Sequence, residues 1–474
     1  MAKTYIGVPR PFPEAARDAL QDSQMRTNLA RATSTIRAKR AGVVAEVPDW
    51  EFLRQAGHDI KMSTLSRLDE HLLGFEKEFV NSGGIVHWAK DAKEATDIVL
   101  QIAQAHGVTE VVKVKSLTTD EIGLNEALNS VGIKAQETDL AELIVQLADE
   151  HPSHILVPAI HKNRTQIRDL FVANLPESPP GLSDEPRELA MVAREHLRKK
   201  FLSATMAVSG ANFAVAESGT LVVVESEGNG RMCLTLPKVL VSVVGIEKII
   251  PTWRDLEVFL QLLPRSSTGE RMNPYTSFWT GNTDGDGPSE RHVILLDNGR
   301  IQTLRDEVGR EALACIRCSA CMNVCPVYER TGGHAYGSVY PGPIGAIITP
   351  QLLGPGQADT LPFASTLCGA CVDVCPVKID IPSILVHLRA RAVESKGATG
   401  ELFLMRALAR VLRDGKALER AQRFLSRSHT VINSIARLHL LRHLPGPSRG
   451  WLASRDVPII PRKSARLAAQ ERIR

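Results

Sequence analysis

Aromatic residues are scarce in this chain: phenylalanine, tryptophan and tyrosine make up 5% of its 474 residues. Stacking surfaces for bases are therefore few, and no nucleic-acid-binding fold is recognisable, so we expect no nucleic-acid partner. No G-x-G-x-x-G run occurs, which removes the usual dinucleotide-binding fingerprint. No apolar run approaches the roughly 18 residues of a membrane span, and the N-terminus lacks the apolar core of a signal peptide. These absences predict a cytoplasmic protein that does not itself transfer a hydride.

The net charge of +4 conceals an uneven distribution. From Glu401 to the C-terminus there are 16 Lys and Arg against 5 Asp and Glu, a net charge of +11, which leaves −7 for the residues before it. We predict a basic tail, helical and then extended, over residues 397–474. Apolar residues between Leu402 and Leu412 interleave with arginines, a pattern compatible with an amphipathic helix that docks a partner or a membrane surface. Packing of this helix against the rest of the chain is the alternative.

Local patterns divide the rest of the chain into three regions. Residues 1–59 are charged and helical in pattern, which predicts an N-terminal arm. Over residues 60–300, helix-like stretches alternate with the apolar runs EVVKVK, HILVPAI, TLVVVES, VLVSVVGI and HVILLD. Several runs are continuously apolar, as in strands of a parallel sheet that is buried on both faces. The region 60–300 therefore predicts an α/β domain, and residues 301–396 predict an all-α, cysteine-rich domain.

Cysteines are few, eight in all, and seven of them lie between positions 315 and 375. This clustering favours metal binding over a disulfide framework. The first motif, C-x2-C-x2-C-x3-C-P over residues 315–326, is the run of bacterial ferredoxins. Three of its cysteines wrap one cubane cluster, and the fourth leaves the loop and binds the other cluster. The second motif, over residues 365–376, is the same run with Ser365 in place of its first cysteine.

Cross-ligation between the motifs predicts two iron–sulfur clusters, for which [4Fe–4S] is the favoured type. The first cluster takes Cys315, Cys318, Cys321 and Cys375. The second takes Cys325, Cys368 and Cys371, and is one thiolate short. Four explanations are open for its fourth iron: a non-cysteine ligand such as Ser365, loss of that iron to leave a [3Fe–4S] cluster, a cap from a partner subunit, or Cys233.

Zinc is the competing metal for C-x2-C pairs, but two runs that each end in Cys-Pro fit a zinc site poorly. The motifs are 43 positions apart, from 325 to 368, so the spacing favours a helical two-cluster domain over the compact βαβ ferredoxin. Paired clusters suit one-electron relay, and thiolate ligation again indicates a reducing, cytoplasmic compartment.

The α/β region also carries segments of a known family. KVKSLTTDEIGLNEAL (113–128), LVPAIHKNR (156–164) and AVAESGTLVVVESEGNGR (214–231) resemble the lactate-utilisation (LUD) domain. With the cysteine motifs and the tail pattern P-G-P-x2-G-W-x3-R-D-x-P (445–458), nearly the whole chain resembles the lactate utilisation protein B family. One departure is Ser319, where relatives commonly carry glycine, and we expect it to leave ligation unaffected.

This resemblance implies a fold and a role. The LUD domain is similar to the sugar-isomerase/CoA-transferase α/β fold. Protein B of the family is the iron–sulfur electron carrier that acts with a cysteine-rich protein A and a LUD-only protein C in the oxidation of L-lactate to pyruvate. The resemblance thus implies a non-catalytic electron-transfer component of lactate catabolism, with an unidentified downstream acceptor.

A catalytic or carboxylate-binding LUD domain, with auxiliary clusters, is the alternative. Glu217 in the AESGT turn is placed like the glutamate of related CoA-transferases, which forms an acyl thioester. The EGNGR turn (227–231) could cradle a carboxylate or phosphate with its backbone N–H groups and Arg231. Three other residues could add positive charge: Lys113, Lys115 and His161. The competing interpretation is that all of these are turn and helix-cap residues in a fold whose catalysis has lapsed.

Overall fold

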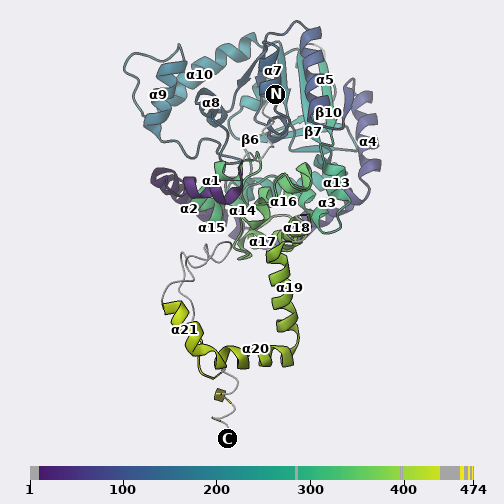
Figure 1. The fold of residues 1–474 in the computed structure, drawn as a ribbon. Coiled ribbons are helices and arrows are strands. Elements are labelled where there is room, and N and C mark those ends of the chain that lie inside the picture. Colours follow the sequence, from purple (N-terminus) through teal and green to yellow (C-terminus); the bar gives the residue numbers. More distant parts are fainter. Residues whose placement is uncertain are drawn as a thin grey trace. The chain divides into compact units, whose positions relative to one another are not determined.

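The computed structural model describes residues 10–282, 285, 287–395, 397, 399–437, 459–463, 468, 469 and 472. The chain divides into two compact units, Met1–Ser395 and Lys396–Arg474. The first unit contains all eight cysteines and every strand of the described residues (Figure 1). The α/β region and the cysteine-rich region therefore lie in one compact body.

The described chain opens with four helices. They are α1 (Phe12–Ala19), α2 (Ser23–Ala45), α3 (Trp50–Ser66) and α4 (Leu68–Asn81). The Asp22 carboxylate caps α2 by accepting a hydrogen bond from the Met25 backbone N–H. Helix α2 packs against α12 (Trp253–Ser267) of the α/β region and against α15 (Pro326–Thr331) of the cysteine-rich region. The predicted N-terminal arm thus bridges the two regions.

A six-stranded, wholly parallel sheet forms the centre of the α/β region, in the order β1-β10-β7-β4-β2-β3. Its strands are β1 (Ile85–Ala89), β2 (Glu110–Lys113), β3 (Lys134–Glu137), β4 (Met206–Ser209), β7 (Val239–Gly245) and β10 (Glu290–Leu296). In the central strand β7 every residue is buried, and Val241 lies between Val208 of β4 and His292 of β10. Burial on both faces accounts for its continuously apolar sequence, as the parallel-sheet prediction requires.

Helices cover both faces of this sheet. Helices α5 (Ala92–Ala105) and α7 (Leu124–Ser130) pack on one face (Figure 1), and the short helix α6 (Leu117–Glu121) contacts β7 and α7. Helices α4 and α11 (Asn229–Thr235) pack on the other. A separate apolar core joins three more helices: α8 (Leu140–Leu147), α9 (Arg164–Asn174) and α10 (Pro186–Ser203). The α/β prediction for this region is confirmed.

A second, four-stranded sheet has the order β8-β5-β6-β9. Its strands are β5 (Phe213–Val215), β6 (Thr220–Glu225), β8 (Ile249–Ile250) and β9 (Tyr275–Trp279). The TLVVVES run forms β6, which is antiparallel to both β5 and β9, so its assignment to the parallel sheet was wrong. The β5–β6 turn passes so close to α4 that a Cβ on Gly219 (φ +63°) would lie 2.4 Å from the Phe79 nitrogen.

The expected strand HILVPAI (154–160) is also a correction, because the structure has turns there. The ring of His154 accepts hydrogen bonds from the backbone N–H groups of Leu156 and Val157, which curls the chain. The apolar residues Ile155 and Ile160 are nevertheless buried, in the core shared with the cysteine-rich region. The run is apolar because it packs between regions rather than within a sheet.

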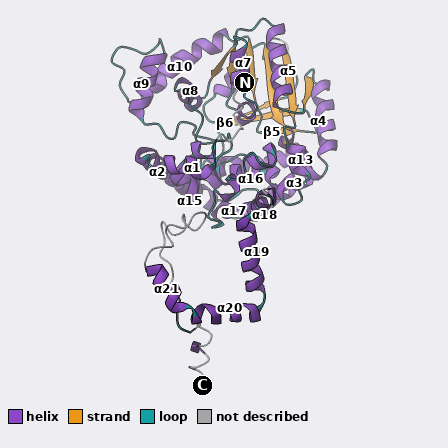
Figure 2. Cartoon of the chain, viewed as in Figure 1, coloured by secondary structure: helices purple, strands orange, loops and turns teal. Residues whose placement is uncertain are grey.

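The cysteine-rich region is helical, and no strand occurs in its described residues (Figure 2). Its elements are α13 (Arg300–Leu304), η2 (Gly309–Ala314), α14 (Ala320–Asn323), α15, η3 (His334–Tyr336), α16 (Gly342–Leu353), η4 (Leu361–Phe363), α17 (Ala370–Val374) and α18 (Ile381–Ser395). The buried, largely apolar α16 contacts α14 and α18 and forms the middle of this region. An all-α cysteine-rich region is therefore confirmed.

The second unit contains α19 (Gly400–Arg413), α20 (Gly415–Arg427) and α21 (His429–Arg437). Large apolar side chains on α19 are exposed, Phe403 at 77% and Leu404 at 64%. The family-like tail pattern at 445–458 lies outside the described residues. Within the described part of the chain, no helix is both long and apolar enough to cross a membrane.

Candidate iron–sulfur centre

The two cysteine loops share one backbone conformation, with equivalent positions 50 residues apart (318 to 368). Arg317 and Ser319 have positive φ values of 61° and 60°, and their counterparts Leu367 and Gly369 have 55° and 84°. Because non-glycine residues rarely adopt this conformation, its occurrence at both positions of both loops identifies a common loop structure. Ser319 adopts the left-handed conformation that glycine favours, so the departure from the family pattern leaves the backbone unchanged.

One group of thiols forms around the first loop. Burial raises the pKa of the Cys318 thiol, and the charges of Cys315 and Cys375 raise it further. Burial likewise raises the pKa of Cys321 well above its ordinary value, with further contributions from Cys315, Cys318 and Cys375 and a smaller one from Cys371 of the second motif. These mutual effects place the second motif's last cysteine beside three cysteines of the first motif.

A second group forms around the other loop. Burial raises the pKa of Cys371 to about 12, with contributions from the charges of Cys325 and Cys368. Burial raises the pKa of Cys325 as well, and the Cys368 charge adds to that rise. In the second group Cys368 is exposed, Cys371 half-buried and Cys325 buried, whereas in the first group Cys315 is half-buried and the other three cysteines are buried. The second group therefore lies nearer the protein surface.

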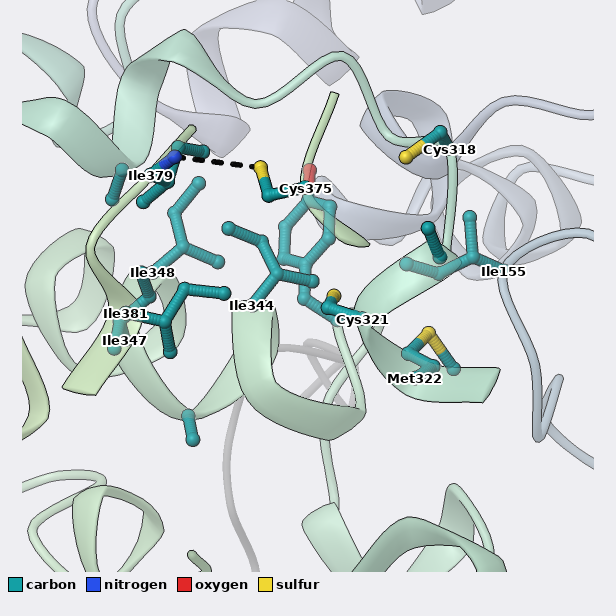
Figure 3. Packing of buried hydrophobic residues seen from close by; sticks show 14 of the residues in the cluster. Ile155, Cys318, Cys321, Met322, Ile344, Ile347, Ile348, Cys375, Ile379 and Ile381 are labelled. Carbon is teal, nitrogen blue, oxygen red and sulfur yellow. Dashed lines mark hydrogen bonds between the residues drawn. The ribbon is translucent and has the colours of Figure 1, made fainter. Parts of the chain in front are cut away.

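The surroundings of these thiols suit an iron–sulfur cluster. Figure 3 shows Cys318, Cys321 and Cys375 among apolar side chains that include Ile344 and Ile348. The backbone N–H of Ile379 donates to Cys375 Sγ, and that of Arg317 donates to Cys315 Sγ, each at 3.4 Å. Soft thiol donors, an apolar shell and N–H donors to sulfur are what such clusters require. No three His, Cys, Asp or Glu side chains of the described residues stand in ready metal-binding geometry. The assignment of each thiol to a cluster stays a prediction.

Two arginines of the N-terminal helices hold the second loop from outside. Arg54 is buried, and its guanidinium donates to the carbonyl oxygens of Val372 and Cys375, each at 2.8 Å. Arg40 donates to the Val374 carbonyl oxygen at 3.0 Å. Both meet the C-terminal end of α17, where a helix favours positive charge. Sequence reasoning missed both residues, because nothing local to them signals the approach of a loop more than 300 positions away.

A buried network of charged groups adjoins the first loop. Glu247, which follows β7, accepts hydrogen bonds from Arg300 Nε at 2.5 Å and Arg317 Nη2 at 3.3 Å. Arg300 also makes a bidentate pair with Glu121, both contacts at 2.8 Å, and the Tyr340 hydroxyl donates to the same carboxylate. The network thus joins the α/β region to the loop that carries Cys315.

The eighth cysteine and the substituting serine lie in different places. Cys233 is buried on α11 in the α/β core, where its sulfur contacts the Thr138 hydroxyl at 3.4 Å, and burial raises its pKa to about 12. It does not join the second thiol group. Ser365 begins the second loop, and its Oγ accepts a hydrogen bond from the Leu367 N–H at 3.1 Å. This contact reproduces the one between Cys315 Sγ and the Arg317 N–H.

The residues suggested for a catalytic LUD domain are mostly engaged in structural contacts. Glu217 is exposed, and its carboxylate accepts a hydrogen bond from the Trp253 N–H at 2.5 Å, at the first residue of α12. The N–H groups of Gly230 and Arg231, expected to cradle a ligand, donate instead to the Glu225 carboxylate at 2.8 and 2.7 Å. This geometry matches the helix-cap interpretation of the two turns.

The three expected positive charges are dispersed rather than gathered. Lys113 is buried between Asp120 and Glu137, with ion pairs of 2.7 Å to each. His161 contacts Glu150 at 2.7 Å. Only Lys115 is loosely paired, at 4.0 Å from Glu142, and it lines a cavity.

Comparisons with known proteins agree with this architecture. Residues 73–296 match the LUD domain family, and residues 311–379 match the 4Fe-4S dicluster domain family. The chain is therefore a LUD-domain protein with a 4Fe-4S dicluster domain.

Curated relatives are similar over nearly the whole chain. "Lactate utilization protein B" of Shouchella clausii (strain KSM-K16) is 39% identical over 458 residues, which cover 94% of each chain. "Lactate utilization protein B 1" of Bacillus mycoides (strain KBAB4) is 40% identical over 96% of this chain and 94% of its own. The chain belongs to the lactate utilization protein B family, as its motifs predicted. A crystal structure of a DUF162 family protein from Deinococcus radiodurans aligns with a TM-score of 0.27 and 15% identity, over 48% of this chain and 98% of that one.

Proposed function

We propose that this protein is the iron–sulfur electron-transfer component of a system that oxidises L-lactate to pyruvate. The observation that carries the proposal is the electrostatic proximity of thiols across the two motifs, since, in addition to burial, the charge of Cys375 raises the pKa of Cys318 in the first loop and the charge of Cys368 raises the pKa of Cys325. This interleaving is what two clusters with cross-ligation need. The names of the relatives supply the link to lactate.

The proposed ligands follow the two groups. Cys315, Cys318, Cys321 and Cys375 hold the first cluster, and Cys325, Cys368 and Cys371 hold three irons of the second. Bound clusters supply one-electron redox chemistry. The chain's own residues keep the first group dry, present the second group near the surface, and fix the second loop through Arg54.

We further propose that Ser365 completes the second cluster. Its Oγ stands at the position equivalent to Cys315 Sγ, it accepts the same i+2 backbone hydrogen bond, and the loop around it has the same two positive φ values. The place of Cys233 on α11, within the α/β core, favours Ser365 over Cys233 as the fourth ligand. A three-iron cluster is the alternative outcome that the experiment below distinguishes.

The partners in this proposal are those implied by the family, a cysteine-rich protein A and a LUD-only protein C. The second cluster would lie near the surface at the exposed Cys368. This position suits electron transfer to or from such a protein, because electron transfer requires close approach of the two redox centres. We also propose that the protein is cytoplasmic, because thiolate ligands remain reduced in that compartment. The two-electron step on lactate belongs to a partner, and this chain relays single electrons.

The test is iron and sulfide analysis with EPR on the anaerobically purified full chain, oxidised and then reduced with dithionite. We expect about eight irons per chain, a silent oxidised state and coupled signals on reduction. Ser365→Ala should lower the content to about seven irons and produce a [3Fe–4S] signal in the oxidised protein, whereas Ser365→Cys should keep eight. Cys233→Ala and Ser319→Gly are matched controls that remove a thiol or a hydroxyl without removing a proposed ligand.

Two results would decide against parts of this proposal. A wild-type chain with seven irons and a three-iron signal leaves the second cluster incomplete, which removes Ser365 as a ligand. Absence of any cluster after careful reconstitution removes the electron-transfer function altogether.

A further inference from the structure

A cavity of about 300 Å³ lies where the α/β region meets the first cysteine loop. It is bordered by segments that follow the carboxyl ends of three parallel strands, with Lys115 after β2, Gly210 after β4 and Lys248 after β7. Arg317 and Tyr340 border it from the cysteine-rich region. Ligands in α/β proteins bind at this edge of a parallel sheet, so the location is that of a binding site rather than a packing defect.

Two cations at this cavity lack sufficient partners. Lys248 is 8% exposed, and among the described residues no group lies within hydrogen-bond or ion-pair distance of its ammonium, so that the charge of nearby Glu247 is its main electrostatic support. Arg317 is also 8% exposed, and its Nη1 is buried without a hydrogen-bond partner, while its Nη2 contacts Glu247 at 3.3 Å. Both cations depend on the single carboxylate of Glu247, which Arg300 also occupies, and a buried charge with too few partners is unfavourable. An anion in the cavity would supply a further partner.

The other charged groups at the cavity restrict the anion's charge. Asp139, Glu225 and Glu227 also line it, and each accepts a hydrogen bond from a backbone N–H at the start of a helix. Their negative charges repel a dianion such as phosphate. An anion with a single negative charge, placed against the two cations, is repelled less.

Polar groups that can recognise a neutral oxygen complete the lining. They are the hydroxyls of Ser116, Thr118 and Tyr340 and the amide of Asn212. At Gly210 a side chain is excluded, because a Cβ there would lie 2.4 Å from Ser116 Oγ. The glycine therefore lets the backbone after β4 pass close to Ser116, and the hydroxyls that border the cavity match a hydroxyl or keto oxygen beside a carboxylate.

We propose that this cavity binds a small organic monocarboxylate of the 2-hydroxy or 2-oxo acid type, with its carboxylate on Lys248 and Arg317. The choice of this class rests on the function proposed above, and the cavity and its two incompletely partnered cations stand independently of it. The bound acid would lie beside the loop of Cys315. The electron-transfer chain would then itself recognise the substrate or product of the system.

The test measures ligand binding to the full chain with its clusters loaded, by anaerobic isothermal titration calorimetry. The probes are L-lactate, pyruvate, acetate and inorganic phosphate. We expect one saturable site for lactate or pyruvate, weaker binding of acetate and none of phosphate. Lys248→Met should weaken binding about tenfold or more through loss of a charge-assisted hydrogen bond, and Lys248→Arg should retain most of it. Lys238→Met is the matched control, because Lys238 is an exposed lysine just before β7.

A second readout separates loss of binding from loss of folding. Iron content and the EPR signals of each variant report the intact protein, and the wild-type EPR spectrum should change when the acid binds beside the first cluster. Intact clusters with no saturable binding of lactate or pyruvate would overturn this inference and leave the proposed function standing. Tighter binding of phosphate, or equal weakening by Lys238→Met, would also overturn it, whereas absent clusters would instead count against the proposed function.

Discussion

Replacing Glu247 with glutamine tests whether the buried charged network stabilises the junction between the α/β region and the cysteine-rich region. Glu247 is 1% exposed and contacts Arg300 and Arg317, which belong to α13 and to the first cysteine loop. Burial alone would raise its pKa, but the charges of Arg300, Lys248 and Arg317 outweigh burial and lower the pKa from 4.5 to about 2. The folded state therefore favours the charged carboxylate.

This lowered pKa gives the size of the effect. At 1.36 kcal/mol per tenfold change, the stabilisation is about 3 kcal/mol. Removing one partner of a buried ion pair typically costs about 3–5 kcal/mol, and Arg300 retains Glu121, so the lower end applies. With an unfolding entropy near 2.1 cal/mol/K per residue, the Met1–Ser395 unit should lose about 4 °C from its unfolding midpoint.

The sign of the pH dependence follows from the same pKa. A carboxylate whose folded pKa is depressed contributes its stability above its ordinary pKa of 4.5, and loses it only as pH falls towards about 2. The ionisation of Glu247 itself therefore adds no pH dependence between pH 6 and pH 8. Burial lowers the pKa of the neighbouring Lys248 to about 7, so the advantage of wild type over Glu247→Gln should decrease as pH rises above 7 and Lys248 loses its charge.

The assay is anaerobic thermal unfolding of the loaded protein at one scan rate, followed by far-UV circular dichroism and by the visible absorption of the clusters. Both signals should shift together in Glu247→Gln. Glu217→Gln is the control, since an exposed helix cap is worth about 1 kcal/mol and should move the midpoint by about 1 °C. A midpoint within about 1 °C of wild type, or a shift in circular dichroism with no change in cluster loss, would refute the reasoning.

Three further outcomes are expected. Cys368→Ala should halve the iron content to about four per chain and leave one reduced EPR signal, because the first thiol group does not include it; loss of both signals would contradict the assignment. Arg54→Met should speed cluster bleaching in air about tenfold, through loss of charge-assisted hydrogen bonds to Val372 and Cys375, and an unchanged rate would show that Arg54 does not hold the loop. Deleting residues 398–474 should leave iron content unchanged, since every cysteine lies in the first unit; if co-purification with partners or membranes is also unchanged, the tail is not a docking element.

The sequence predicted what depends on local order. The loop structure follows from cysteine spacing, and the helix at Ala92–Ala105 follows from an apolar stripe with an Asp91 cap. The apolar runs at 239–246 and 292–297 predicted two strands of the parallel sheet. Their residues are apolar because the strands are buried on both faces of the sheet. The run at 154–160 failed because apolarity reports burial and not backbone conformation, which His154 sets through its ring.

The charged residues around the site were beyond local prediction. Lys113 was expected to offer a free charge, but Asp120 and Glu137 neutralise it across the sheet. Lys248 and Arg54 gave no local signal, and their roles arise only when segments far apart in the chain pack together. Arg317 did have a signal, because an arginine inside a C-x2-C loop must lie close to the metal ligands. That proximity marks it as a residue to examine in any such loop.

The positions of the two thiol groups restrict the order of electron flow under the proposed function. A partner protein can approach Cys368 at the surface, whereas Cys318, Cys321 and Cys375 are buried. The cavity, in contrast, borders the loop of the buried group through Arg317. A bound carboxylate would therefore lie beside the first cluster, and a docked partner beside the second. Because Cys325 and Cys375 each leave one loop for the other group, a change at either cluster is transmitted to the loop of its neighbour. If both proposals hold, the fold would couple recognition of the acid at the first cluster to electron transfer with a partner at the second.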